Sequence, residues 1–94
     1  MNDNKLLIDR LSQLINDVSR EKKNQREIDA ELNSIYQATE FDYVQEKLSS
    51  ALVWSSIYFS PRRWKKWGDI SVVKSFLISD IHKAEMGLHS LIRS

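Results

Sequence analysis

The sequence predicts an all-α protein. Nine positions in the first third of the chain follow an unbroken spacing of four and three residues, and seven of them are apolar: Leu7, Leu11, Leu14, Val18, Glu21, Gln25, Ile28, Leu32 and Ile35. This spacing places side chains on one stripe of an α-helix, as in coiled coils and helical bundles. The 94 residues include only two glycines and one proline, too few for the turns of a hairpin-rich β fold.

The size and composition of the chain indicate one small domain, 1–94, with limited surface to bury. Self-association is common at this size. Because the chain has no cysteine, disulfide bonds and thiolate metal sites are excluded. The polar N-terminus lacks the apolar core of a signal peptide, and the longest apolar stretch, 51–59, is far shorter than the ~20 residues of a membrane span. We therefore expect a cytoplasmic protein.

The first helix is predicted over residues 4–38, and its polar centre, 20–27, leaves two alternatives. A continuous helix would be roughly 50 Å long at ~1.5 Å per residue, too long for one small chain to cover without a partner. A break would make Asn24 the N-cap of a second helix, with Glu27 completing a capping box. The continuous helix is the favoured prediction, because no glycine or proline lies in this region and its residues are good helix formers.

Glu21 and Gln25 make the middle of the apolar stripe polar. Polar residues buried at such positions can fix the register and the oligomeric state of paired helices. Alternatively, the helices bend apart at this point and both side chains lie in water. Exposure to water is the favoured interpretation.

The second helix is predicted over residues 40–59, with Thr39 and Asp42 as a capping pair at its start. From residue 51 onward the side opposite its inner stripe also becomes apolar, which predicts burial on several sides or a subunit contact. Four serines in this helix are interpreted as small residues that let helices approach closely: Ser49, Ser50, Ser55 and Ser56. The inner stripe itself consists of Phe41, Val44, Leu48, Ala51, Leu52, Ser55 and Phe59.

A restart of the chain is expected at Ser60 and Pro61, where a cap precedes a proline at the first helical position. The short helical turn 61–67 that follows ends at Gly68. The last helix is predicted over residues 70–93, with Asp69 or Ser71 as its cap. The expected architecture is a long first helix packed against a C-terminal helical hairpin, bundle-like, and dimeric through the first helix and the 51–59 stretch.

The segment 61–67 is the most distinctive part of the sequence. It contains two tryptophans and four basic residues. In one interpretation, the tryptophan side chains seal the end of the helical core, while the basic side chains around them stay in water. Alternatively, the segment binds another protein, because tryptophan and arginine are enriched at binding hot spots. Phosphate contacts and base stacking make nucleic acid a further alternative, and an anionic membrane surface is the least favoured one. The candidate partner-binding residues are Arg62, Arg63, Trp64, Lys65, Lys66 and Trp67.

The sequence offers little for catalysis or for metal binding. His82 and His89 are seven residues apart, which separates them by ~10 Å along a helix, too far to share one ion. Acidic pairs of the first helix, such as Asp17 with Glu21, lack the apolar surroundings that would raise a carboxyl pKa. Two glycines cannot build a phosphate-binding loop or a nucleophile elbow. We therefore expect no enzymatic activity, no metal and no cofactor.

The charges are distributed unevenly along the chain. Residues 1–47 carry ten acidic and seven basic side chains, and residues 48–94 carry three acidic and seven basic ones, so the halves are net −3 and +4. This asymmetry favours electrostatic complementarity within a dimer or toward a partner. The sequence as a whole predicts a non-catalytic protein–protein interaction module, a small homodimeric regulator, adaptor or inhibitor of a larger protein. Nucleic-acid binding through 61–67 is the alternative, and membrane association is not expected.

Overall fold

The fold, taken from a computed structural model that describes residues 3–93, is all-α, as predicted. Residues 1, 2 and 94 of the expected domain lie outside this range. Among the described residues, none of the helices combines the length and the apolar character that crossing a bilayer requires. The elements are α1 (Asp3–Ser19), α2 (Gln25–Ala38), α3 (Asp42–Tyr58), α4 (Pro61–Trp64), the 3-10 turn η1 (Lys65–Trp67) and α5 (Ile70–Arg93).

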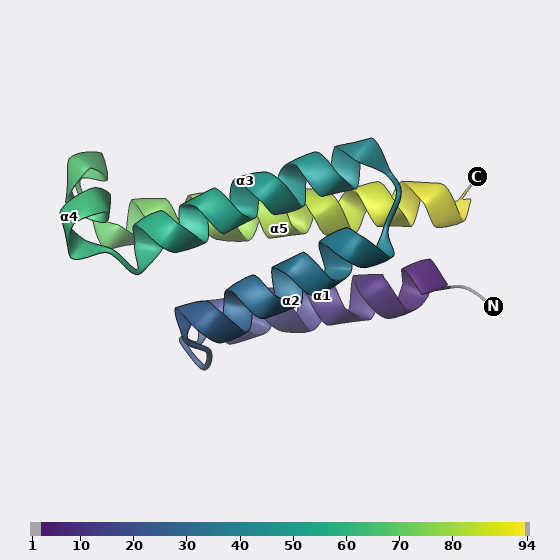
Figure 1. The fold of residues 1–94 in the computed structure, drawn as a ribbon, viewed down its shortest axis with the longest axis horizontal. Helices are drawn as coiled ribbons and strands as arrows, with labels where there is room; N and C mark the ends of the chain where they lie inside the picture. The colour runs from purple at the N-terminus through teal and green to yellow at the C-terminus, as the bar shows by residue number, and fades with distance from the viewer. Residues whose placement is uncertain (1–2, 94) are drawn as a thin grey trace.

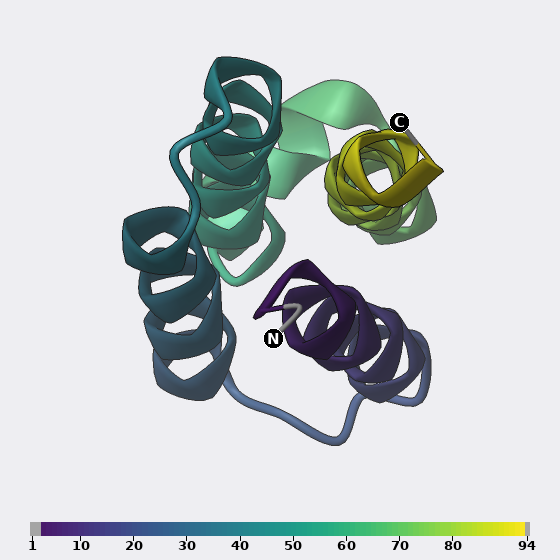
Figure 2. The ribbon, with the colours of Figure 1, turned by 90° about the vertical axis from the view of Figure 1, so that its right-hand side faces the viewer.

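The four long helices surround one core (Figure 2). The hairpin of α3 and α5 forms the most extensive contact, α1 packs on α5, and α2 packs on α3. By contrast, α1 and α2 have few contacts with each other. The resulting bundle is elongated, 43 × 22 × 19 Å, with α4 at one end of the long axis (Figure 1).

The favoured prediction of a continuous helix over 4–38 is wrong, and the break lies where the alternative placed it. After α1 ends at Ser19, residues 20–24 reverse the chain, and α2 begins after the N-cap Asn24. The capping box is complete: the Glu27 N–H donates to Asn24 Oδ1 (2.9 Å) and the Asn24 N–H donates to Glu27 Oε1 (3.1 Å). The reversal lets both halves of the apolar stripe enter one core, and this burial outweighs the helix propensity of the turn.

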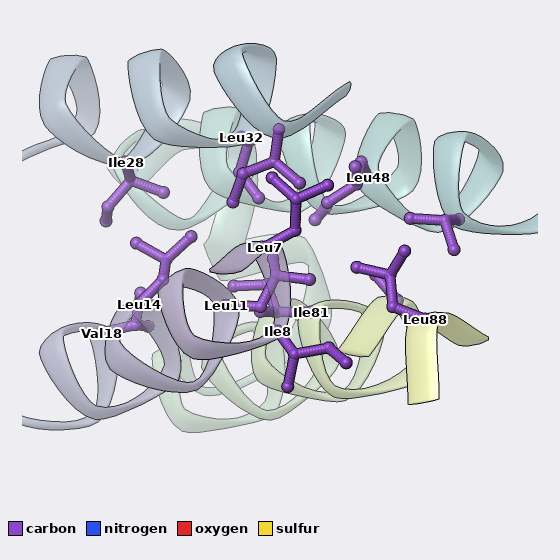
Figure 3. Close-up of a cluster of buried hydrophobic side chains, with 14 of the residues drawn as sticks. Leu7, Ile8, Leu11, Leu14, Val18, Ile28, Leu32, Leu48, Ile81 and Leu88 are labelled. Atoms are coloured by element: carbon purple, nitrogen blue, oxygen red, sulfur yellow. The ribbon is translucent and has the colours of Figure 1, made fainter. Parts of the chain in front are cut away.

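The core contains all seven apolar positions of the stripe. Figure 3 labels all of them except Ile35. Their side chains point toward those of α3 and α5, so the folded chain covers the stripe without a second subunit. The stripe residues are Leu7, Leu11, Leu14 and Val18 of α1 and Ile28, Leu32 and Ile35 of α2, and they meet Val44, Leu48, Ala51, Leu77, Ile81, Ala84 and Leu88.

The 20–24 turn is held against the C-terminal hairpin by polar contacts. Tyr58 Oη donates to Glu21 Oε1 (3.0 Å), while the Glu21 side chain is otherwise largely exposed. Lys74 Nζ donates to the carbonyl oxygen of Ser19 (2.9 Å), which satisfies one of the free carbonyls at the end of α1. Burial, and then the hydrogen bond to the Glu21 carboxylate, raises the pKa of Tyr58 above 10.0. As the favoured interpretation held, Glu21 lies in water rather than in a buried seam, whereas Gln25, at the start of α2, is half-buried.

A bidentate ion pair joins α1 to α2. Arg10 Nε donates to Glu31 Oε2 (3.1 Å) and Arg10 Nη2 donates to Glu31 Oε1 (2.6 Å). Arg10 Nη2 also donates to Ser34 Oγ (2.9 Å). The hydrogen bond to Glu31 raises the pKa of Arg10, and the fork geometry aligns the two helices more strictly than a single contact would.

The predicted capping pair at the start of the second helix is wrong. Thr39 is instead the C-cap of α2, and its Oγ1 accepts from the N–H of Phe41 (3.3 Å). The N-cap of α3 is Phe41, which makes no side-chain capping bond, so the predicted helix 40–59 narrows to Asp42–Tyr58. The last helix covers 70–93 as predicted, with Asp69 Oδ1 accepting from the N–H of Ser71 (3.0 Å).

Replacing Ser55 with alanine is expected to stabilise the protein. Ser55 is fully buried on α3 and its Oγ has no hydrogen-bond partner. Removing such a hydroxyl should raise the free energy of unfolding by about 1 kcal/mol in a urea titration. Ser49→Ala is the matched control, because Ser49 is exposed on the same helix and gains the same helix propensity. If Ser55→Ala were less stable than Ser49→Ala, the buried hydroxyl would have to be bonded.

Candidate functional site

The segment 61–67 forms the short helical turn that the sequence predicts, at one end of the α3–α5 hairpin (Figure 1). Pro61 occupies the first turn of α4, where its missing N–H removes no hydrogen bond. Gly68 ends the turn with φ 94°, a left-handed conformation that favours glycine. The turn thereby connects α3 to α5 and presents its side chains at the end of the bundle.

The two tryptophans of this segment have different surroundings. Trp64 is partly buried and packs against a small cluster formed by Ile57, Tyr58 and Val73. Trp67 leaves 47% of its surface exposed. The interpretation as a core seal therefore describes Trp64, and the interpretation as a binding residue remains open for Trp67.

Trp67 belongs to an aromatic cluster with Trp54 of α3 and Phe76 of α5. The ring centres of Trp54 and Trp67 lie 5.0 Å apart in an edge-to-face arrangement, and those of Trp54 and Phe76 lie 4.8 Å apart. Phe76 is 40% exposed, and Val72, one helical turn before it on α5, is exposed as well. Large aromatic surfaces left in water next to each other are typical of interaction sites.

The four cations of the segment are exposed. Arg63 Nη1 donates to Ser56 Oγ (2.8 Å), and none of the four forms an ion pair with a carboxylate of the described residues. Their charge is therefore not neutralised within this part of the chain. The cations lie beside the aromatic cluster, because Trp67 follows directly after Lys65 and Lys66.

A second basic segment, 20–26, lies at the same end of the bundle (Figure 1). It carries Arg20, Lys22, Lys23 and Arg26 with one acidic residue, and the hydrogen bond from Tyr58 to the acid of this segment joins it to the end of α3. Residues 20–26 and 61–69 are each net +3; because the whole chain is net +1, the other residues together are net −5. This concentration of positive charge depends on the break between α1 and α2, which the favoured prediction did not contain.

His82 of α5 and Asp17 of α1 make structural contacts, whereas His89 is exposed. His82 Nδ1 lies 3.4 Å from Glu85 Oε1. Asp17 accepts a hydrogen bond from Gln13 Nε2 (3.0 Å) and lies 3.7 Å from Lys23 Nζ. Within the described part of the chain, no three histidine, aspartate or glutamate side chains are grouped so that they could hold a metal ion.

No protein-family model, no curated protein and no solved structure matches this chain. Its function is therefore inferred from its own surface. The distinctive features of that surface are the aromatic cluster, the four cations beside it and the second basic segment at the same end.

Proposed function

We propose that the protein is a non-catalytic binding module that docks an acidic surface of a larger protein and acts as its regulator, adaptor or inhibitor. The observation that carries this proposal is the aromatic cluster, in which Trp67 and Phe76 leave 47% and 40% of their surfaces in water. Tryptophan at the centre of an interface is a typical hot-spot residue.

The surroundings of the aromatic cluster support docking. Its three rings pack against one another, so their orientations are fixed before a partner arrives and less side-chain entropy is lost on binding. The unpaired cations of 61–67 form a charged rim, and carboxylates of a partner complement it. We therefore expect a partner with an apolar side chain flanked by acidic residues.

The homodimer predicted from the sequence also remains a proposal. The original reason for it, a long helix that needs a partner, does not hold for the folded chain, which covers its own stripe. A different reason for a dimer is the conformation of the 20–24 turn, in which Glu21 has φ 57°.

Docking is tested by photo-cross-linking. A photoreactive phenylalanine analogue replaces Val72, which is exposed one helical turn before Phe76, and the protein is then incubated with nuclease-treated cell extract. We expect cross-links to one protein, weakened at least about tenfold by Trp67→Ala and by Lys65→Glu with Lys66→Glu. Met86→Ala is the control, because Met86 is exposed on α5 but is not part of the aromatic cluster. Cross-links that persist in all variants would contradict the proposal.

Nucleic-acid binding is the second candidate, and the second basic segment favours it. Two net +3 segments at one end of the bundle could follow a phosphate backbone while a base stacks on Trp67. For about four phosphate contacts, log K should fall against log salt with a slope of roughly −3. Unchanged affinity for an oligonucleotide in a variant with alanine at positions 62, 63, 65 and 66 would exclude nucleic-acid binding through the segment 61–67.

A further inference from the structure

We propose that the 20–24 turn is a hinge through which two copies of this chain exchange their α1 helices, so that α1 and α2 join into one continuous helix over residues 3–38. In this swapped dimer, α1 of each copy docks on α5 of the other. The proposal concerns self-association and is independent of the docking site at the aromatic cluster.

The conformation of the turn favours opening. Glu21 has φ 57°, in the left-handed region, where residues other than glycine, asparagine and aspartate are rarely found. The turn contains no glycine or proline, and its arginine, glutamate and lysine residues are good helix formers. A continuous helix through this region relieves the backbone strain at Glu21 and suits the sequence. Short strained connections of this kind are a known route to domain swapping.

The packing of α1 permits the exchange. Most of its contacts are with α5, and few are with α2, to which the turn connects it. The hydrogen bond from Lys74 Nζ to the Ser19 carbonyl oxygen belongs to the folded monomer and opposes opening, because a continuous helix would use this carbonyl for the N–H of Lys23. A second copy offers an identical surface, so the buried stripe of α1 can be covered in trans by the same side chains that cover it in the folded monomer.

The spacing of apolar residues fits the swapped dimer, the open form, as well as the folded monomer, the closed form. The four-three spacing runs without interruption from Leu7 to Ile35, so a continuous helix keeps both halves of the stripe on one side. Glu21 and Gln25 would then occupy the middle of that side, near the point where the two long helices of the dimer meet. In the closed form, the capping box of Asn24 and the Tyr58–Glu21 hydrogen bond oppose opening. The balance between the two forms therefore depends on protein concentration.

The Arg10–Glu31 ion pair provides a test that identifies the swap. In the swapped dimer, Arg10 of one copy pairs with Glu31 of the other. The single variants Arg10→Glu and Glu31→Arg place like charges across this contact in their own chains. When the two variants are mixed, a swapped heterodimer contains two opposite-charge pairs, so we expect the mixture to form dimers at concentrations at least about tenfold lower than either variant alone.

The control is the double variant Arg10→Glu with Glu31→Arg, which restores the ion pair in every arrangement and should behave as the unaltered protein. Mass is measured by light scattering over a concentration series, after refolding the mixed chains together. A mixture that behaves as the sum of its two components, or a dimer that forms without preference for the mixed pair, overturns the proposal.

A second test uses the hinge itself, in the otherwise unaltered chain. Glu21→Gly and Glu21→Ala both remove the carboxylate that Tyr58 contacts. Glycine accepts the left-handed turn and weakens a continuous helix, whereas alanine does the reverse. The equilibrium constant for opening one hinge should be roughly thirtyfold larger in the alanine variant than in the glycine variant. Because two hinges open in each dimer, the dimer Kd of the alanine variant should be about a thousandfold lower. Equal dimer Kd values for the two variants, or monomers in both up to millimolar concentration, overturn the proposal.

Discussion

Replacing Leu11 with alanine is expected to lower the free energy of unfolding by about 3 kcal/mol. Leu11 is completely buried on α1, and its side chain points into the centre of the core between α2, α3 and α5 (Figure 3). The substitution removes buried apolar surface and leaves a cavity that four packed helices cannot close. For a domain of this size, such a loss is a large part of the total stability.

Leu6→Ala is the matched control, because it changes the same residue type on the same helix. Leu6 is 60% exposed, so its replacement should change the free energy of unfolding by less than about 0.5 kcal/mol. Urea titrations followed by circular dichroism measure both values. Comparable losses at the two positions would show that α1 does not use the face that the structure assigns to the core.

Trp64→Ala is expected to lower the free energy of unfolding by about 2 kcal/mol, and Trp67→Ala by less than about 1 kcal/mol. Trp64 packs against the buried Ile57, Tyr58 and Val73, so its removal uncovers the end of the core. Trp67 touches other aromatic rings but leaves nearly half of its surface in water.

The same pair of variants separates folding from binding. Thermal unfolding measures stability, and the cross-linking at position 72 measures docking. We expect Trp67→Ala to fold normally and to lose docking, whereas Trp64→Ala melts earlier. A stability loss at Trp67 equal to that at Trp64 would indicate that both indoles serve the core, and would remove the main support for the docking proposal.

The sequence was sufficient to predict the helical class, the buried stripes and the last helix. The reason is that apolar residues recur with the period of the helix on the face that is buried. Leu77 and Ile81, for example, follow the spacing of α5 and are fully buried. The break between α1 and α2 was the less favoured prediction, although Asn24 and Glu27 carry its signal. Local propensity favours a continuous helix there, and only the gain from burying Leu7 and Ile35 in one core decides against it.

The candidate site could be located only in part from the sequence. The cations and both indoles of 61–67 are visible as a cluster, but Trp54 and Phe76 come from other helices and join Trp67 only in the folded chain. The available signal was that Trp54 is an aromatic residue outside the predicted inner stripe of its helix. Gly87 carried no signal at all: a Cβ there would lie 2.9 Å from the Tyr43 ring, so its absence allows α5 to approach α3 closely.

The separation of charge between the two basic segments and the rest of the chain gives the molecule an electric dipole. An anionic partner that diffuses within about one Debye length, roughly 8 Å at physiological ionic strength, feels this field before any contact forms. The field turns the basic end of the bundle, with Trp67 beside it, toward the partner. For the proposed acidic partner, added salt should therefore slow the formation of the complex far more than it speeds its dissociation.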